Sequence, residues 1–152
     1  MFPFTRVNAP SMPPPRAYHS LTLVAHDTKM VLFGGFDGST RLNDLHVFDL
    51  QSETWETPSD DRACRPSPRT YHSATLHGNL LFIFGGFGGN DKYPKHLADL
   101  HILDTSTWQW TSSLGGESFS GSARYFHSAT LVDFNKLFVF GVSSVGSQPP
   151  QS

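Results

Sequence analysis

The sequence has a single cysteine, few charges and no long apolar run. Cys64 cannot form a disulfide within the chain, so a reducing compartment is expected. No apolar stretch approaches the roughly 20 residues that a membrane-spanning helix needs. The formal net charge is −2 and no basic block occurs, which argues against nucleic acid or an anionic membrane as the main partner. We therefore expect a cytoplasmic protein, with the nucleus as the other location considered.

The composition favours an all-β domain. Hydrophobic residues make up 38% of the chain, enough for a core and unlike a disordered tail. The 13 glycines and 11 prolines, set among few charges, indicate many short strands joined by tight turns.

An internal repeat is the strongest pattern in the sequence. The segment RAYHSLTL begins at Arg16, RTYHSATL at Arg69 and RYFHSATL at Arg124, which gives a period of about 50 residues. A glycine pair, an aspartate and a tryptophan follow in the same order in the first two copies: Gly34-Gly35, Asp49 and Trp55, then Gly85-Gly86, Asp104 and Trp110. Several features that recur in register are a specific sign of repeated structural units.

Each complete repeat predicts four short strands. In the first repeat they lie at residues 19–24, 30–33 and 45–50 and around Trp55. The second strand is apolar at consecutive positions, which predicts burial on both faces. The glycine pair predicts a tight exit from that strand. The extra residues 90–96 of the second repeat predict a surface loop without strand pattern. Four strands in a period near 50 residues indicate a β-propeller blade.

These motifs resemble the kelch family, in its longer, intracellular form of the repeat. The resemblance implies four-stranded antiparallel blades, with the Arg-x-Tyr-His-Ser segment on the innermost strand and the tryptophan on the outermost. The expected units are a lead-in with an outer strand at 1–15, in which Phe2 stands for the tryptophan, repeats at 16–68 and 69–123, a truncated repeat at 124–141 and a disordered tail at 142–152.

Two full repeats and part of a third are fewer than the roughly four to eight blades of a closed propeller. The expected fold is therefore a partial, open kelch propeller. We expect a piece of a longer protein, because exposed strand edges invite aggregation. The alternative is that copies of the chain assemble to close a ring.

The sequence favours no enzyme, metal or cofactor. Five histidines occupy repeat positions, which suits hydrogen bonds made once per blade better than a metal site: His19, His46, His72, His101 and His127. No metal-binding spacing occurs, and Cys64 is interpreted as an ordinary loop thiol. The recurring aromatic residues are interpreted as core: Tyr18, Tyr71, Phe33, Phe84 and Phe140. The alternative function is a fragment of a metal-dependent catalytic kelch propeller whose ligands lie outside this chain.

A non-enzymatic protein-binding module is the favoured function. In a propeller, Arg16, Arg69 and Arg124 would surround one mouth of the central channel, and the resemblance implies that they bind acidic groups of a partner. The alternative is a salt bridge made once per blade, to Asp44 or Asp99, that holds adjacent blades together. The variable loops at that mouth add further candidates: Asp37, Arg41, Asp91, Lys92 and Tyr93. The resemblance implies partners such as small GTPases, cytoskeletal or polarity factors, or ubiquitin-ligase substrates.

Overall fold

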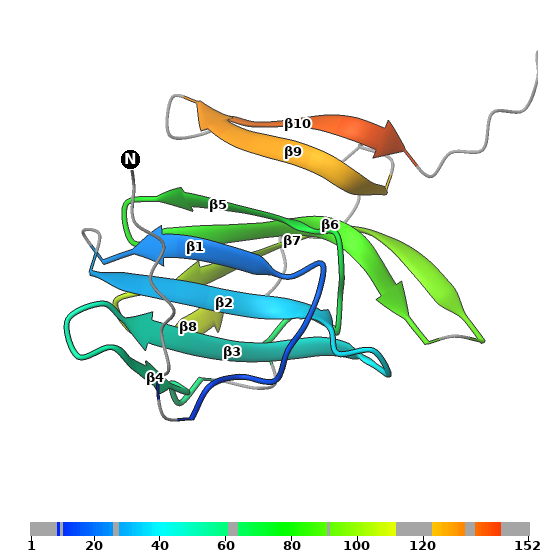
Figure 1. Cartoon of the computed structure of the whole chain (residues 1–152). Coiled ribbons are helices and arrows are strands. Elements are labelled where there is room, and N and C mark those ends of the chain that lie inside the picture. The colour runs from blue at the N-terminus through cyan, green and yellow to red at the C-terminus, as the bar shows by residue number, and fades with distance from the viewer. Residues whose placement is uncertain are drawn as a thin grey trace, which may run out of the picture.

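The computed structural model describes residues 9, 11–25, 28–60, 64–90, 92–111, 123–132 and 136–143. They form two four-stranded antiparallel sheets and one two-stranded sheet (Figure 1). The first sheet contains β1 (Ser20–Val24), β2 (Lys29–Phe36), β3 (Arg41–Asp49) and β4 (Thr54–Glu56). The second contains β5 (Ser73–His77), β6 (Leu80–Gly89), β7 (Pro94–Asp104) and β8 (Gln109–Thr111). The third pairs β9 (Arg124–Val132) with β10 (Lys136–Ser143).

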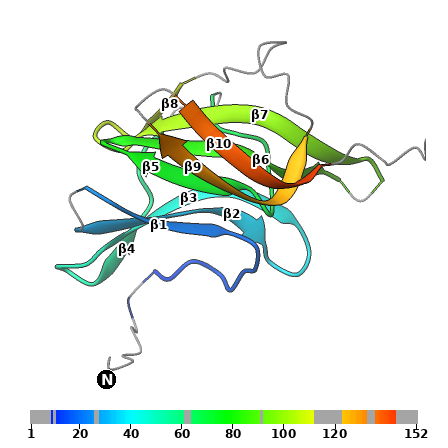
Figure 2. The ribbon, with the colours of Figure 1, turned by 90° about the horizontal axis from the view of Figure 1, so that it is seen from above.

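The three sheets stack side by side in chain order. Their first strands are neighbours, because β1 contacts β5 and β5 contacts β9. In Figure 2, seen from above, β9 and β10 lie over the second sheet, and the first sheet lies beside it. Strands within each sheet pair in simple succession, without crossovers. The predicted class is confirmed: this is an all-β, partial and open propeller with four-stranded antiparallel blades.

The hydrophobic core lies between the first two sheets. Val31, Phe33 and Val47 of the first sheet are fully buried, and Ile83 and Leu103 of the second face the same core. The central strands of both sheets, β2, β3, β6 and β7, supply most of the core residues, because each has a strand on both sides and a neighbouring sheet packed on its face. Consecutive residues of the second strand are buried, so the predicted burial on both faces is confirmed.

The sequence predicted that the glycine pairs end the second strand, and this is wrong. β2 continues through Gly34 and Gly35 to Phe36, with a shift in pairing register between Phe33 and Gly35. Both glycines have positive φ, 65° and 100°. The pair is therefore a bulge inside the strand, and β6 has the same shift between Phe84 and Gly86.

This bulge receives the backbone of the next repeat. The amide of Gly35 donates to the carbonyl of Arg69 at 2.9 Å, and the amide of Arg69 donates to the carbonyl of Leu42 at 3.0 Å. A Cβ placed on Gly34 would lie 2.9 Å from the Arg69 carbonyl oxygen, and one on Gly35 would lie 2.8 Å from that of Ala17. Glycine is thus required both for the backbone conformation and for the close approach of the neighbouring sheet.

The four-residue insertion of the second repeat also differs from the predicted loop. β6 runs to Gly89 and β7 begins at Pro94, so residues 94–96 are strand. The longer hairpin projects beyond the neighbouring sheet (Figure 1). β10 continues to Ser143, past the expected end of the third repeat. The predicted outer strand at residues 1–8 and the tail after residue 143 lie outside the described residues, and residues 11–15 are not in a strand.

Replacing Gly34 by alanine tests the packing requirement against a matched control. Gly78 has a similar φ of 56°, but a Cβ there would meet nothing within 4 Å. We expect Gly78→Ala to cost about 1 kcal/mol for the left-handed backbone alone. Gly34→Ala should cost about 2 kcal/mol more, because overpacking displaces the neighbouring sheet. Urea unfolding of both variants measures the difference, and equal losses would show that close approach is unimportant.

Candidate functional site

Each repeat arginine in the two complete sheets is held by an aspartate of the third strand of its own sheet. Arg69 Nη1 and Nη2 donate to the two carboxylate oxygens of Asp99 at 2.9 and 2.8 Å, and Nη1 also donates to the carbonyl of Gly85 at 3.0 Å. Arg16 binds Asp44 in the same forked way. The Arg69 side chain is 0% exposed and that of Arg16 is 2% exposed. These guanidinium groups therefore clamp the entry of the first strand to β2 and β3, or to β6 and β7.

A histidine completes each clamp. Nε2 of His101 lies 2.8 Å from a carboxylate oxygen of Asp99, and His46 is placed equally on Asp44. Burial opposes ionisation of both aspartates. Hydrogen bonds from the histidine and then from the arginine outweigh it, and hold the pKa of each carboxyl well below its usual range. Both carboxylates stay ionised and paired at neutral pH.

The second repeat histidine links neighbouring sheets. His72 Nε2 lies 2.9 Å from Ser20 Oγ of the first sheet, and His127 Nε2 lies 2.9 Å from Ser73 Oγ of the second. Burial and then the Arg69 charge lower the pKa of His72 to about 3, so the ring is neutral. These are the once-per-blade hydrogen bonds that the repeat positions predicted, and they hold the sheets in register.

Two turns with the same pattern of side-chain to backbone hydrogen bonds lie at one end of the sheets. Asp37 Oδ1 accepts hydrogen bonds from the amides of Ser39 at 2.8 Å and Thr40 at 2.7 Å. Asn90 Oδ1 accepts from the amides of Lys92 at 3.1 Å and Tyr93 at 2.8 Å. Such short polar side chains fix a turn by mimicking a backbone carbonyl. The turns are alike in construction and differ in the side chains that they expose.

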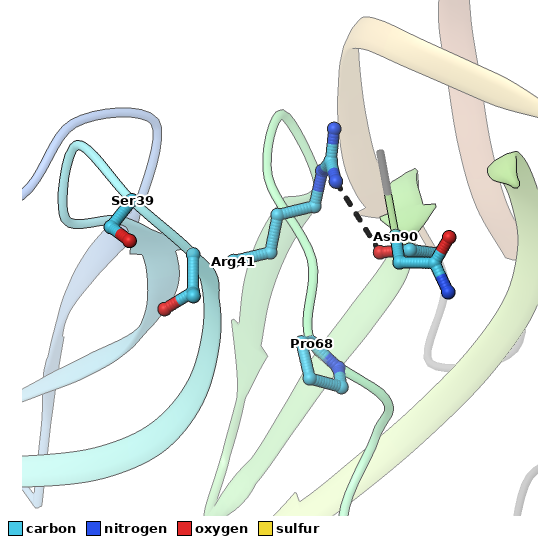
Figure 3. A pocket seen from close by; sticks show the side chains of 6 residues that line it. Ser39, Arg41, Pro68 and Asn90 are labelled. Carbon is cyan, nitrogen blue, oxygen red and sulfur yellow. Dashed lines mark hydrogen bonds between the residues drawn. The ribbon is translucent and has the colours of Figure 1, made fainter. Parts of the chain in front are cut away.

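Arg41 lies between these turns and separates two hollows. Its Nη1 donates to the carbonyl of Gly89 at 3.3 Å, and its Cζ lies 4.7 Å from the ring centre of Phe87. Figure 3 shows Arg41 extending from the first sheet toward the turn that contains Asn90, with Ser39 and Pro68 beside it. The outer hollow measures about 180 Å³ and is lined by Ser39, Thr40, Arg41, Pro68, Gly89 and Asn90. The inner hollow measures about 200 Å³ and is lined by Tyr18, Phe36, Arg41, Thr70, Tyr71 and Phe87.

Three tilted aromatic rings pack one against the next, and two of them, Tyr18 and Tyr71, line the inner hollow. The ring centres of Tyr18 and Tyr71 are 4.2 Å apart, and those of Tyr71 and Phe126 are 4.0 Å apart. Each residue follows a repeat arginine by two positions and has a positive φ, between 52° and 61°. Left-handed backbone is costly for aromatic residues and tends to occur at functional sites. We call the turns 37–40 and 90–93, Arg41 and these three rings the rim.

Comparison with known proteins assigns the chain to a family. The model described as the KLHDC2/KLHL20/DRC7 Kelch-repeats domain matches residues 5–148. The chain belongs to the kelch-repeat family. This confirms the resemblance carried by the glycine pairs and by the Arg-x-aromatic-His-Ser segments.

Curated kelch proteins are similar over most of the chain. It is 36% identical over 140 residues to "Kelch domain-containing protein 3" of Rattus norvegicus, covering 91% of the chain and 35% of that protein. It is 35% identical over 99 residues to "Kelch domain-containing protein 1" of Mus musculus, covering 65% and 23%. It is 38% identical over 111 residues to "Rab9 effector protein with kelch motifs" of Rattus norvegicus, covering 72% and 29%. The chain spans about a third or less of the length of these relatives.

Arg16 and Arg69 form the salt bridges to Asp44 and Asp99 that were the alternative to a binding role. Arg69 is fully buried, so its guanidinium cannot reach a partner. The pairing is within one blade, whereas the alternative had placed it between adjacent blades. Arg124 donates to the carbonyl of Gly141 at 2.8 Å, and no carboxylate within the described part of the chain pairs with it. The repeat arginines hold the chain two residues before each aromatic residue of the rim.

The loop candidates lie at the rim with different roles. Asp37 is exposed, but its carboxylate is used by its own turn, and hydrogen bonds from Thr40 and Ser39 lower its pKa. Arg41 lines both hollows. Tyr93 is 66% exposed, with Lys92 Nζ 5.3 Å from its ring centre. Asp91 lies outside the described residues.

The aromatic residues correct the sequence interpretation in part. Phe33 and Phe84 are core, as interpreted. Tyr18 is 51% exposed at the rim because its left-handed backbone turns the ring out of the sheet. Phe140, placed in the core by its repeat position, is 85% exposed. The sequence analysis did not assign Phe36, Thr70, Phe87 or Phe126 to the site; the aromatic after each glycine pair was the signal for two of them.

No group of histidine, cysteine, aspartate and glutamate side chains in the described ranges is arranged to hold a metal ion. Within the same ranges, no helix is long and apolar enough to cross a membrane.

Removing the Arg69 clamp should destabilise the fold. Arg69→Ala leaves Asp99 partly buried without its counter-charge, and we expect a loss of about 3 kcal/mol in the free energy of unfolding. The double variant Arg69→Ala/Asp99→Ala should recover part of that loss, because no unpaired charge remains. Denaturant unfolding measures both, with exposed Lys95→Ala as the control. An unchanged stability in Arg69→Ala would contradict the clamp.

Acidification should weaken the fold through His72. Its pKa is about 3 in the folded chain against 6.5 for the ordinary group, so protons bind the unfolded chain more tightly. This stabilisation is complete above pH 6.5 and is lost as the pH falls toward 3, by about 3 kcal/mol between pH 6.5 and pH 4. His72→Gln keeps a side-chain group that can hydrogen-bond to Ser20 but does not titrate. Urea unfolding across this range should give the variant a shallower pH dependence; identical slopes would exclude His72 as the cause.

Proposed function

We propose that this kelch chain binds a protein partner at the rim and does not catalyse a reaction on it. The observation that carries the proposal is the pair of hollows on either side of Arg41, at the seam between two sheets. Each hollow is of about 200 Å³ or less, well below the roughly 300–1,000 Å³ of pockets that enclose drug-sized ligands. Hollows of this size suit single side chains of a larger partner.

The support beneath the rim favours binding without rearrangement. Arg16 and Arg69 are clamped inside their sheets, and the histidine–serine bonds join one sheet to the next. Binding loops on a rigid scaffold lose little conformational entropy when a partner docks. The two turns share one backbone construction and expose different side chains, so they can contribute specificity without loss of stability.

The kelch relatives support a binding role in general terms. One is named as an effector of Rab9, and the others are named only by their kelch domains. Small GTPases, cytoskeletal or polarity factors and ubiquitin-ligase substrates remain the proposed partner classes. The rim is suited to a short exposed segment of such a protein, because its two hollows share Arg41 as a lining residue at one seam.

Peptide selection on the rim tests this function. Peptides selected from a displayed random library on the immobilised full chain should bind the unmodified chain at least about tenfold more tightly than the double variant Arg41→Ala/Tyr93→Ala. Isothermal titration with the synthetic peptides gives the affinities. Both substituted residues lie at the rim, and Arg41 lines both hollows.

The matched control is Gln51→Ala, an exposed position beyond the opposite end of β3. It should leave peptide affinity unchanged. Selected peptides that bind the double variant as tightly as the unmodified chain would place the interaction elsewhere and overturn the proposal.

A further inference from the structure

The chain contains two versions of the seam between neighbouring sheets. The first seam joins the sheets of β1–β4 and β5–β8, and the second joins β5–β8 to β9–β10. Residues at equivalent repeat positions can be compared directly. Phe36, Arg41, Thr70 and Tyr71 at the first seam correspond to Phe87, His96, Tyr125 and Phe126 at the second.

At the second seam, an aromatic ring of the chain itself lies where the first seam has the inner hollow. The Tyr125 ring is stacked on His96, with ring centres 4.8 Å apart and an angle of 5° between the planes. It is also 6.1 Å from the ring centre of Phe87 and 5.2 Å from that of Phe126. Three equivalents of the residues that line the inner hollow therefore surround Tyr125.

At the first seam the equivalent wall positions are occupied by Phe36, Arg41 and Tyr71, and no such ring lies between them. Thr70 takes the position of Tyr125, is 3% exposed and donates through its hydroxyl to the carbonyl of Phe87 at 3.2 Å. Its short side chain leaves the hollow of about 200 Å³ between Tyr71, Phe36 and Arg41. At the repeat position that supplies the ring, the filled seam has tyrosine and the open seam has threonine.

We propose that the inner hollow accepts an aromatic side chain of the protein partner, stacked against Arg41 as Tyr125 is stacked against His96. The proposal rests on the rim being the protein-binding surface. A guanidinium plane stacks favourably on an aromatic ring, as an imidazole does. Arg41 already lies over Phe87, so a ring brought by the partner extends an existing cation–aromatic contact.

The chemistry of the walls selects an aromatic ring over an acidic or aliphatic side chain. The lining residues comprise four rings, one guanidinium and a threonine whose hydroxyl is already hydrogen-bonded. Aromatic pairs gain stabilisation beyond the area that they bury, which an aliphatic chain does not match. A carboxylate would find one cation but would lose its hydration against four apolar faces.

The test uses short capped peptides on the full chain. The peptides Gly-Gly-Tyr-Gly-Gly and Gly-Gly-Leu-Gly-Gly are titrated while amide chemical shifts are followed by NMR. The tyrosine peptide should shift the amides of Thr70, Tyr71 and Arg41 in a saturable way, at least about tenfold more tightly than the leucine peptide. Equal responses to the two peptides at these amides would overturn the proposal.

Two substitutions exchange the seams. Thr70→Tyr supplies the ring from within, as Tyr125 does at the second seam, and should abolish the response to the tyrosine peptide. Tyr125→Thr should open a second hollow, so that the same peptide also shifts the amides of His96 and Phe126. Thermal unfolding checks that both variants fold. If Thr70→Tyr leaves the response intact, or Tyr125→Thr adds none, the hollow is not an aromatic site.

The result is separable from the test of the rim as a whole. Peptides selected on the chain that lose affinity in Arg41→Ala/Tyr93→Ala, but lack an aromatic residue and bind Thr70→Tyr normally, would keep the rim and refute the aromatic site. Selected peptides with a common aromatic residue whose affinity falls at least about tenfold in Thr70→Tyr would support both.

Discussion

The contact between the glycine bulge of one sheet and the backbone of the next is the constraint on which the rest of the structure depends. The carbonyl of Arg69 accepts a hydrogen bond from Gly35 and its amide donates to Leu42, so backbone groups alone fix the entry of the second sheet to the first. A side chain at Gly34 or Gly35 would lie under 3 Å from a backbone oxygen. The spacing between neighbouring sheets is therefore set by backbone, and the apolar core fills the space that remains.

That entry also explains why the arginines are buried and the aromatic rings are exposed. Once the backbone at residue 69 is held in the bulge, its side chain points into the sheet and meets Asp99. Two residues later the chain must enter β5, and the left-handed backbone at Tyr71 makes the change of direction. The ring is turned to the rim as a result. The same geometry at Tyr18 and Phe126 brings the three rings into contact, one against the next.

Much of the fold could be predicted from sequence because it depends on patterns that repeat. The register of Arg-x-aromatic-His-Ser, glycine pair, aspartate and tryptophan predicted the four-stranded sheets, and the recurrence of His72 and His127 predicted bonds between sheets. The bulge at Gly34 was mistaken for a strand end because a pair of glycines suits either. Strand propensity could not show that residues 94–96 extend β7, since the pairing partner on β6 decides it.

The candidate site was harder to predict because it depends on side-chain volume at positions with no pattern of their own. Arginines expected at a channel mouth suggested a binding role. Only the positions of Asp44 and Asp99 in space show that the charges of Arg16 and Arg69 are already paired. The exposed side of Tyr18 follows from a φ angle that no propensity predicts for tyrosine. The hollow beside Thr70 exists because a small residue stands where the next repeat has a ring, which becomes meaningful only when the two seams are compared in space.

The comparison of repeats within this one chain separates what holds the sheets from what can vary. The clamp uses the same residue types in both complete sheets, and the bulge and the histidine–serine bond use the same residue types at both seams. The residues that differ include Arg41 and Thr70, which line the inner hollow of the first seam, and their equivalents His96 and Tyr125 at the second seam. Since the clamps carry the structure, these positions are free to change without loss of the fold. A repeat architecture of this kind can therefore alter its binding surface one seam at a time, and Thr70 marks the seam that is open.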